Sequence, residues 1–173
     1  MRRESRPLVR NLRGWTCASC SHSITRIEDG WVEWLAVEDR VSKLKGLRLV
    51  HTIAASPRGE KKTGCRYDQR REFQKGGSIV EGLPLERFVG PDGLMLLLSF
   101  LAGGDFPRND VLELTKRVQI PGYEQTRELF DVAIHSGVVN PSIRAGYYLQ
   151  WEIHELLDWA EHEIRSSASQ GNS

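Results

Sequence analysis

The spacing of hydrophobic and polar positions changes halfway along the chain. Between about residues 24 and 53 short β-prone runs are separated by polar turns, as expected for strands. From about residue 90 onward the apolar residues recur every three or four positions, which is typical of amphipathic helices. The pattern therefore predicts an α+β protein, in which a small antiparallel β unit is followed by a helical unit.

Three strands are expected in the first half of the chain. Asp29-Gly30 lies between two β-prone runs, 24–28 and 31–37, and this dipeptide favours a tight hairpin turn. Successive side chains of the second run should point to opposite faces of the sheet. After a polar turn, residues 47–53 are expected to form the third strand.

The helical half is divided by glycine and proline. Helices are expected over about 91–102, 107–120, 123–135 and 150–164, with a short β-ribbon at 138–149. Three helices, a small hairpin and a closing helix resemble a winged-helix arrangement in their order. The apolar faces of these helices should form a core of their own, so the helical unit is expected to fold without the metal.

Candidate chemistry first appears at Cys17 and Cys20, two of only three cysteines. A spacing of two residues lets both sulfurs face one centre from a single turn, as a tetrahedral zinc ion requires. A redox pair is the alternative, but such a pair usually opens a helix. The residues that follow this CxxC turn are β-prone, so the sequence favours zinc.

The remaining ligands are sought among the few suitable side chains. Cys65 is the third by elimination, and Gly64 before it permits a tight backbone. His51 is the preferred fourth ligand, which gives a structural Cys₃His site; His22 and Asp68 are the alternatives. A CxxC turn followed by three antiparallel strands resembles a zinc ribbon or a rubredoxin-like fold over about residues 15–68.

These features give a predicted organisation in five segments. They are a basic arm (1–14), a zinc-ribbon-like β unit (15–75), a linker (76–89), a helical winged-helix-like unit (90–165) and a disordered tail (166–173).

Charge is distributed unevenly although the net charge is only +1. Residues 1–89 carry 18 Lys and Arg against 11 Asp and Glu, whereas residues 90–173 carry 6 against 12. The basic half suits a polyanion such as nucleic acid, and the acidic half suits a protein partner. The expected nucleic-acid contacts are Arg10, Arg13, Arg58, Lys61, Lys62, Arg66, Arg70 and Arg71.

We therefore expect a non-enzymatic, zinc-binding regulatory module of the cytoplasm that contacts nucleic acid through its basic unit. The alternative is a protein-interaction adaptor or inhibitor with a structural zinc site, and a thiol-dependent enzyme is the least favoured hypothesis. The sequence has no phosphate-binding glycine loop, GxSxG or HExxH motif, and no apolar run long enough to span a bilayer.

Overall fold

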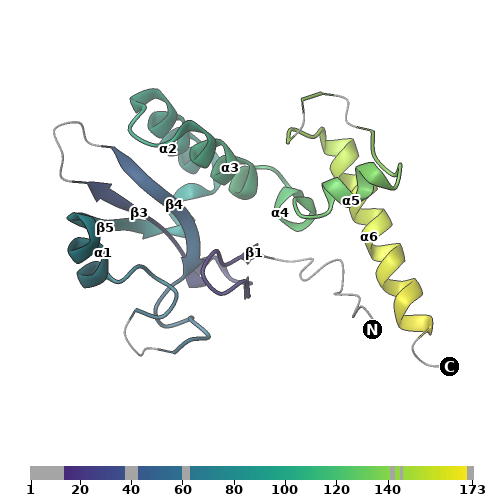
Figure 1. Cartoon of the computed structure of the whole chain (residues 1–173). Helices are drawn as coiled ribbons and strands as arrows, with labels where there is room; N and C mark the ends of the chain where they lie inside the picture. The colour runs from purple at the N-terminus through teal and green to yellow at the C-terminus, as the bar shows by residue number, and fades with distance from the viewer. Residues whose placement is uncertain (1–13, 38–42, 60–62, 141–142, 145, 171–173) are drawn as a thin grey trace. The chain divides into compact units, whose positions relative to one another are not determined.

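The structure is a computed structural model of the 173-residue chain (Figure 1). It describes residues 14–37, 43–59, 63–140, 143–144 and 146–170. The described residues combine antiparallel sheets with helices, which confirms the predicted α+β class. They fall into two compact units that divide between Ile120 and Pro121, and each unit is described by itself. No helix among the described residues is both long and apolar enough to cross a membrane.

The first unit is built on a three-stranded antiparallel sheet. The strands are β3 (Gly30–Val37), β4 (Leu44–His51) and β5 (Ser78–Pro84), in the order β4-β3-β5. The central strand β3 pairs along both edges and is the most buried of the three, which fits its run of tryptophan, valine and leucine.

The predicted hairpin at Asp29-Gly30 is wrong. Residues before it form β2 (Ser23–Ile24), which pairs with β1 (Trp15–Thr16), and then the 3₁₀ helix η1 (Ile27–Asp29). Gly30 has an extended backbone (φ −97°) and begins β3 opposite the end of β4. This glycine is required for space, because a Cβ at position 30 would collide with the Leu85 side chain.

Residues 76–89, which were predicted to be a linker, form secondary structure instead. They contain the edge strand β5 and the 3₁₀ helix η2 (Leu85–Phe88), and their glycine-rich start ends the helix α1 (Gln69–Gly76). Asp68 caps α1 by accepting a hydrogen bond from the Arg71 backbone N–H, and Gly77 ends it in the left-handed region (φ 66°). The glycines that suggested flexibility are therefore a helix terminus.

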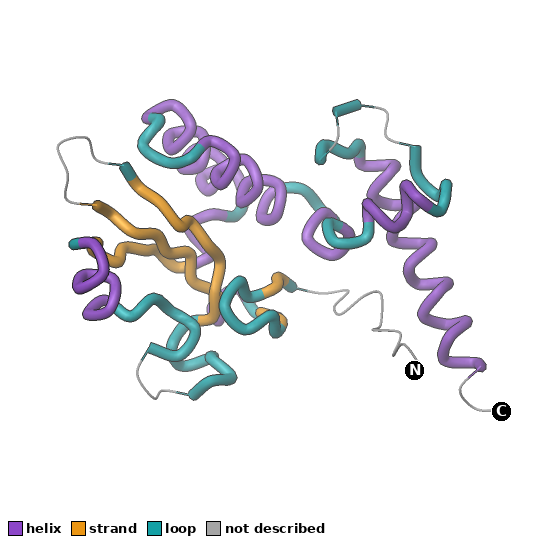
Figure 2. Tube along the Cα trace, viewed as in Figure 1, coloured by secondary structure: helices purple, strands orange, loops and turns teal. Residues whose placement is uncertain are grey.

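Two helices predicted for a separate helical unit belong to the sheet unit. These are α2 (Gly90–Gly103) and α3 (Arg108–Gln119), and they lie against one face of the sheet (Figures 1 and 2). Trp34 of β3 meets Phe100 and Phe106 edge-on, with ring centroids 5.8 and 5.6 Å apart. Because this apolar core joins the sheet to both helices, the boundary lies after residue 120 and not at 76–89.

The second unit contains three helices among its described residues. They are α4 (Tyr123–Thr126), α5 (Phe130–His135) and α6 (Gln150–Gln170). Phe130 stacks on Tyr148 (3.3 Å between centroids). Ile153 and Leu156 of α6 are completely buried in the same core.

The single helix predicted for 123–135 is interrupted. The Thr126 hydroxyl donates to the carbonyl of Gly122 (2.9 Å), and the Leu129 N–H then bonds the Thr126 carbonyl at i−3 (2.8 Å), so the α-helical ladder is broken. The described part of 138–149 contains no strand. With no ribbon there, and with α2 and α3 packed on the sheet, the predicted winged-helix arrangement is not formed by the described residues.

The last helix is longer than predicted. Residues 166–170 continue α6, because the hydrogen-bonded helix runs to Gln170, and residues 171–173 lie outside the described part of the chain. The predicted basic arm, 1–14, lies outside it as well except for Gly14.

Candidate metal centre

The CxxC turn connects β1 to β2 and is fixed by backbone hydrogen bonds. The Cys17 N–H donates to the His22 carbonyl, and the Ser21 N–H donates to the Cys17 carbonyl, both at 2.9 Å. Ser21 has a left-handed backbone (φ 61°), which turns the chain back toward β2. A further bond from the Ala18 N–H to the Leu49 carbonyl (2.9 Å) holds the turn against β4.

His51 is the last residue of β4, and its ring orientation is defined by one hydrogen bond. Its Nε2 lies 3.0 Å from the Ser23 carbonyl, which can only accept, so Nε2 carries the proton. Nδ1 is thereby left with a lone pair that faces Cys20 Sγ at 3.6 Å and Cys65 Sγ at 3.8 Å. Tetrahedral zinc with ordinary Zn–S and Zn–N bonds separates such atoms by about 3.6 Å.

Cys65 arrives at the centre from the loop after β4. Gly64 before it has a positive φ (57°), and a Cβ there would lie 2.8 Å from the Ser56 Cβ, so this position requires glycine. The Ser56 hydroxyl lies 3.1 Å from Cys65 Sγ and can donate to the sulfur when it is a thiolate. The loop is therefore shaped to present one thiol, with a hydroxyl group next to its sulfur.

The structure brings all four preferred ligands together. The ligand atoms of Cys17, Cys20, His51 and Cys65 lie within 4.8 Å of one another and could hold a metal ion. All but Cys20, which is half-buried, are buried. The alternative fourth ligands lie elsewhere: exposed His22 has its Nδ1 3.0 Å from the Cys20 carbonyl oxygen, and Asp68 caps α1.

The two thiols of the CxxC turn have very different proton affinities. Burial opposes ionisation of Cys17, but hydrogen bonds from the backbone of Cys20, Ser19 and His51 outweigh it and lower the pKa of Cys17 to about 7. Burial, together with the neighbouring thiols of Cys65 and Cys17, raises the pKa of Cys20 to about 12. The centre therefore accepts one negative charge readily and resists a second, unless a cation is bound to neutralise it.

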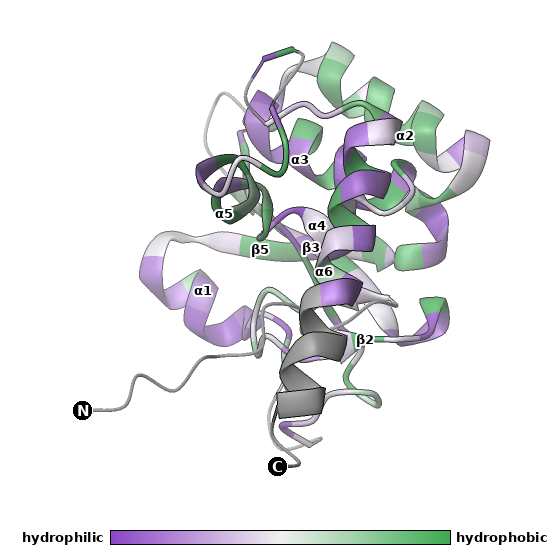
Figure 3. Cartoon of the chain, turned by 90° about the vertical axis from the view of Figure 1, so that its right-hand side faces the viewer, coloured by the Kyte–Doolittle hydropathy of each residue, from purple (hydrophilic) through white to green (hydrophobic). Residues whose placement is uncertain are grey.

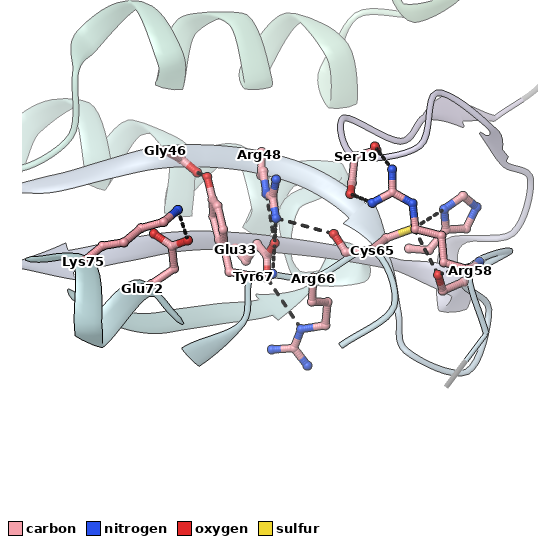
Figure 4. Close-up of polar contacts among 12 residues, drawn as sticks. Ser19, Glu33, Gly46, Arg48, Arg58, Cys65, Arg66, Tyr67, Glu72 and Lys75 are labelled. Atoms are coloured by element: carbon pink, nitrogen blue, oxygen red, sulfur yellow. Dashed lines mark hydrogen bonds and ion pairs between the residues drawn. The ribbon is translucent and has the colours of Figure 1, made fainter. Parts of the chain in front are cut away.

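A buried carboxylate lies next to the centre on the opposite face of the sheet from α2 and α3. Glu33 of β3 accepts hydrogen bonds from Arg48 Nε and Nη2 (2.9 and 2.7 Å) and from the Tyr67 backbone N–H (2.9 Å) (Figure 4). Arg66 approaches its other oxygen at 3.6 Å. Glu33 was not among the predicted site residues, although a charged residue within an apolar strand is the signal that could have identified it.

Among the predicted nucleic-acid contacts that the structure describes, some are held by other residues and some are exposed. Arg58 and Arg66 are partly engaged: Arg58 donates to the Ser19 carbonyl and hydroxyl (2.6 and 3.0 Å), and Arg66 lies over the Trp31 ring at 4.3 Å. Arg70 and Arg71 are exposed on α1, a strongly hydrophilic helix (Figure 3). The predicted contacts Arg10, Arg13, Lys61 and Lys62 lie outside the described residues.

A pocket of about 420 Å³ brings most of these cations together beside the metal centre. The basic side chains among its described lining are Arg48, Arg58, Arg66, Arg71 and Lys75. Arg48 was not in the predicted set, because only the fold places β4 beside the loop before Cys65. Arg70, by contrast, does not line the pocket.

Fold and site together define a small α+β protein with a candidate metal centre of three thiols and one imidazole, next to a basic pocket. Comparisons of the chain with protein-family models, with curated proteins and with solved structures found no match.

Proposed function

We propose that the protein is a non-enzymatic, zinc-stabilised module that binds nucleic acid through the basic surface beside its metal centre. Zinc is the ion that this donor set favours, because three thiolates and one imidazole in tetrahedral spacing suit its softness and geometry. A structural role follows from the number of ligands, since four protein ligands leave no position for a reacting water.

The observation that carries the nucleic-acid proposal is the pocket of five cations next to the metal centre. Arg58 donates to Ser19 within the CxxC turn, and Arg48 donates to the Cys65 carbonyl at 3.4 Å, so a bound metal would also fix the basic surface. Two more cations, Arg70 and the amino-terminal Arg10, extend the same charge along the sequence. A polyanion gains affinity from each phosphate that such a surface neutralises.

Two measurements on the purified 173-residue chain test the two parts. Native mass spectrometry should find one zinc ion per chain, and three thiols that react freely in the folded, untreated protein would contradict the metal proposal. Affinity for a single-stranded oligonucleotide should then fall steeply between about 50 and 200 mM salt, because counterion release dominates such binding. No binding at low salt would contradict the nucleic-acid proposal.

A protein partner is the second candidate function, and the outer face of α2 favours it. Leu94, Met95 and Leu98 are 38%, 66% and 46% exposed, and Leu94 and Leu98 are one helical turn apart. Replacing Met95 and Leu98 by lysine should abolish capture of such a partner and leave oligonucleotide binding unchanged. If the same replacements also lowered the affinity for the oligonucleotide, α2 would belong to the nucleic-acid-binding surface. The proposal of a separate protein partner would then be contradicted.

A further inference from the structure

Some cations of the basic pocket are bound to other residues of the protein, and the others are able to contact a ligand. Arg48 is committed to the fold, because it donates twice to the buried Glu33 and once to the Cys65 carbonyl. Arg58 is committed to the CxxC turn through two bonds to Ser19. Both guanidinium groups therefore form a fixed, positively charged wall of the pocket, and dashed lines in Figure 4 mark the bonds that hold them.

Three further cations can turn toward a ligand. The Arg71 side chain is exposed and has no hydrogen bond or ion pair to another described residue. Lys75 pairs with Glu72 at 3.1 Å, but its side chain is 55% exposed, so the pair is weak and easily exchanged. Arg66 meets Glu33 only through Nε, at 3.6 Å.

The size and charge of the pocket specify the chemical class of the ligand. Its volume of about 420 Å³ lies in the range of small-molecule sites. Five cations there face the carboxylates of Glu33, Asp68 and Glu72, so positive charge remains for an anion. Planar arginine forks are matched to phosphate oxygens, which they can bind through two bonds at once.

Two aromatic rings near the pocket carry a guanidinium group on one face. The Arg48 guanidinium lies over the Tyr67 ring at 3.4 Å, and Arg66 lies over the Trp31 ring at 4.3 Å. Tyr67 is the only aromatic residue among the pocket's described lining, and Arg48 covers one face of its ring, so the phosphate is the group that the pocket's cations recognise.

We propose that this pocket is a phosphate site for one nucleoside phosphate unit, held by Arg71, Lys75 and Arg66 and indifferent to the base. The inference rests on the proposed nucleic-acid binding and gives that binding its anchoring position. The same chemistry is offered by a free nucleotide and by one unit of a strand, so the experiment includes both.

The metal centre and the phosphate site are mechanically joined. Arg58 belongs to the loop that ends at Cys65, and it bonds Ser19 between the two cysteines of the CxxC turn. Thr63 and Gly64, which precede the metal ligand Cys65, also line the pocket. Removal of the metal should therefore loosen two walls of the pocket and weaken phosphate binding.

Calorimetry on the full-length, metal-loaded protein tests the proposal. Adenosine 5′-monophosphate and uridine 5′-monophosphate should bind with affinities within about threefold of each other, and adenosine should not bind. Arg71→Gln should weaken both nucleotides about tenfold or more, as expected for the loss of charge-assisted hydrogen bonds. Lys75→Gln should weaken them too, so the test does not depend on one variant.

Arg87→Gln is the matched control, because it removes one exposed positive charge of the same unit outside the pocket. Unchanged nucleotide affinity in this variant, with unchanged metal content in all three, assigns the effect to the pocket. Equal losses in Arg71→Gln and Arg87→Gln would overturn the proposal, as would equal binding of adenosine and its monophosphate. Competition by an acidic peptide as effective as the nucleotide would also overturn it, in favour of an acidic protein surface.

An oligonucleotide arm separates this inference from the proposed function. If the oligonucleotide binds and Arg71→Gln does not weaken it more than Arg87→Gln does, the phosphate site is wrong while nucleic-acid binding stands. If the free nucleotides bind and the oligonucleotide does not, the phosphate site stands and the proposed function is wrong.

Discussion

Arg48 Nη2 lies 2.7 Å from Glu33 Oε1, and this ion pair is the physical link between the sheet, the metal centre and the basic pocket. Glu33 is completely buried on β3, while the Arg48 side chain on β4 is 23% exposed at the pocket. The same guanidinium also reaches the Cys65 carbonyl. One buried carboxylate thus orders a strand pair, a metal-binding loop and a basic wall.

The first prediction concerns Glu33→Ala. The substitution should lower the free energy of unfolding by about 3 kcal/mol or more, because it leaves Arg48 and the Tyr67 N–H without their buried acceptor. Urea unfolding of the metal-loaded protein measures this loss of stability. The midpoint should move to a lower urea concentration, while the free energy of unfolding keeps the same dependence on urea.

Its control is Glu28→Ala, which removes the partner of Arg26 in an exposed ion pair whose side chains are 61% and 71% exposed. That change should cost less than about 1 kcal/mol. Equal effects of the two substitutions would show that the Glu33 pair has no special role.

The second prediction concerns the identity of the ligands. His51→Ala and Cys65→Ser should lower metal affinity by more than the roughly 10–100-fold typical of a lost outer-shell contact, because each removes a direct ligand. His22→Ala should keep one metal per chain, since the exposed His22 ring lies outside the cluster. Competition with a chromogenic chelator measures all three, and loss of metal in His22→Ala alone would reverse the assignment.

The third prediction concerns acidity. Thiols and imidazole must lose their protons to bind the metal, so the metal should be released as the pH falls. In the metal-free protein the pKa of Cys17 is about 7, below the ordinary 9.0, so one thiolate should form as the pH rises through about 7. Thiolate absorbance near 240 nm measures this step.

Cys17→Ser should remove that step, whereas Cys20→Ser should not, because the pKa of Cys20 is raised to about 12. In urea all three thiols should titrate together at an ordinary pKa, since the surrounding backbone donors are then gone. A step near neutral pH that persists in Cys17→Ser would contradict the assignment.

The fourth prediction concerns the boundary after Ile120. A fragment of residues 14–120 with its metal should unfold cooperatively, because it contains the whole core of Trp34, Phe100 and Phe106. A fragment of residues 80–165 should not, since it leaves α2 and α3 without the sheet. Far-UV circular dichroism during heating compares them, and a cooperative transition in the second fragment alone would place the boundary back near residue 80.

The sequence alone identified the elements whose signals are local. Proline and glycine marked α2 and α3 within one or two residues, and apolar spacing marked α6 from its first residue. It also singled out the four residues of the metal cluster, since thiols are scarce and a CxxC spacing has few uses. These predictions depended on neighbours in the chain, where backbone geometry relates residue types to structure directly.

Tertiary structure decided what depends on distant partners. Gly30 gave a hairpin signal, but the Leu85 side chain requires the glycine for space, and β2 pairs with β1 instead. Glu33 is buried only because Arg48, 15 residues later in the sequence, lies opposite it on β4.

The sequence by itself determined α2, α3 and α6, the central strand and the three thiols of the candidate metal centre. The fold alone decided that α2 and α3 pack on the sheet, that His51 takes the position for which His22 was the alternative, and that Arg48, Arg66 and Arg71 meet in one pocket. The physical reason is that periodicity specifies which face of an element is apolar but not which other element will bury it.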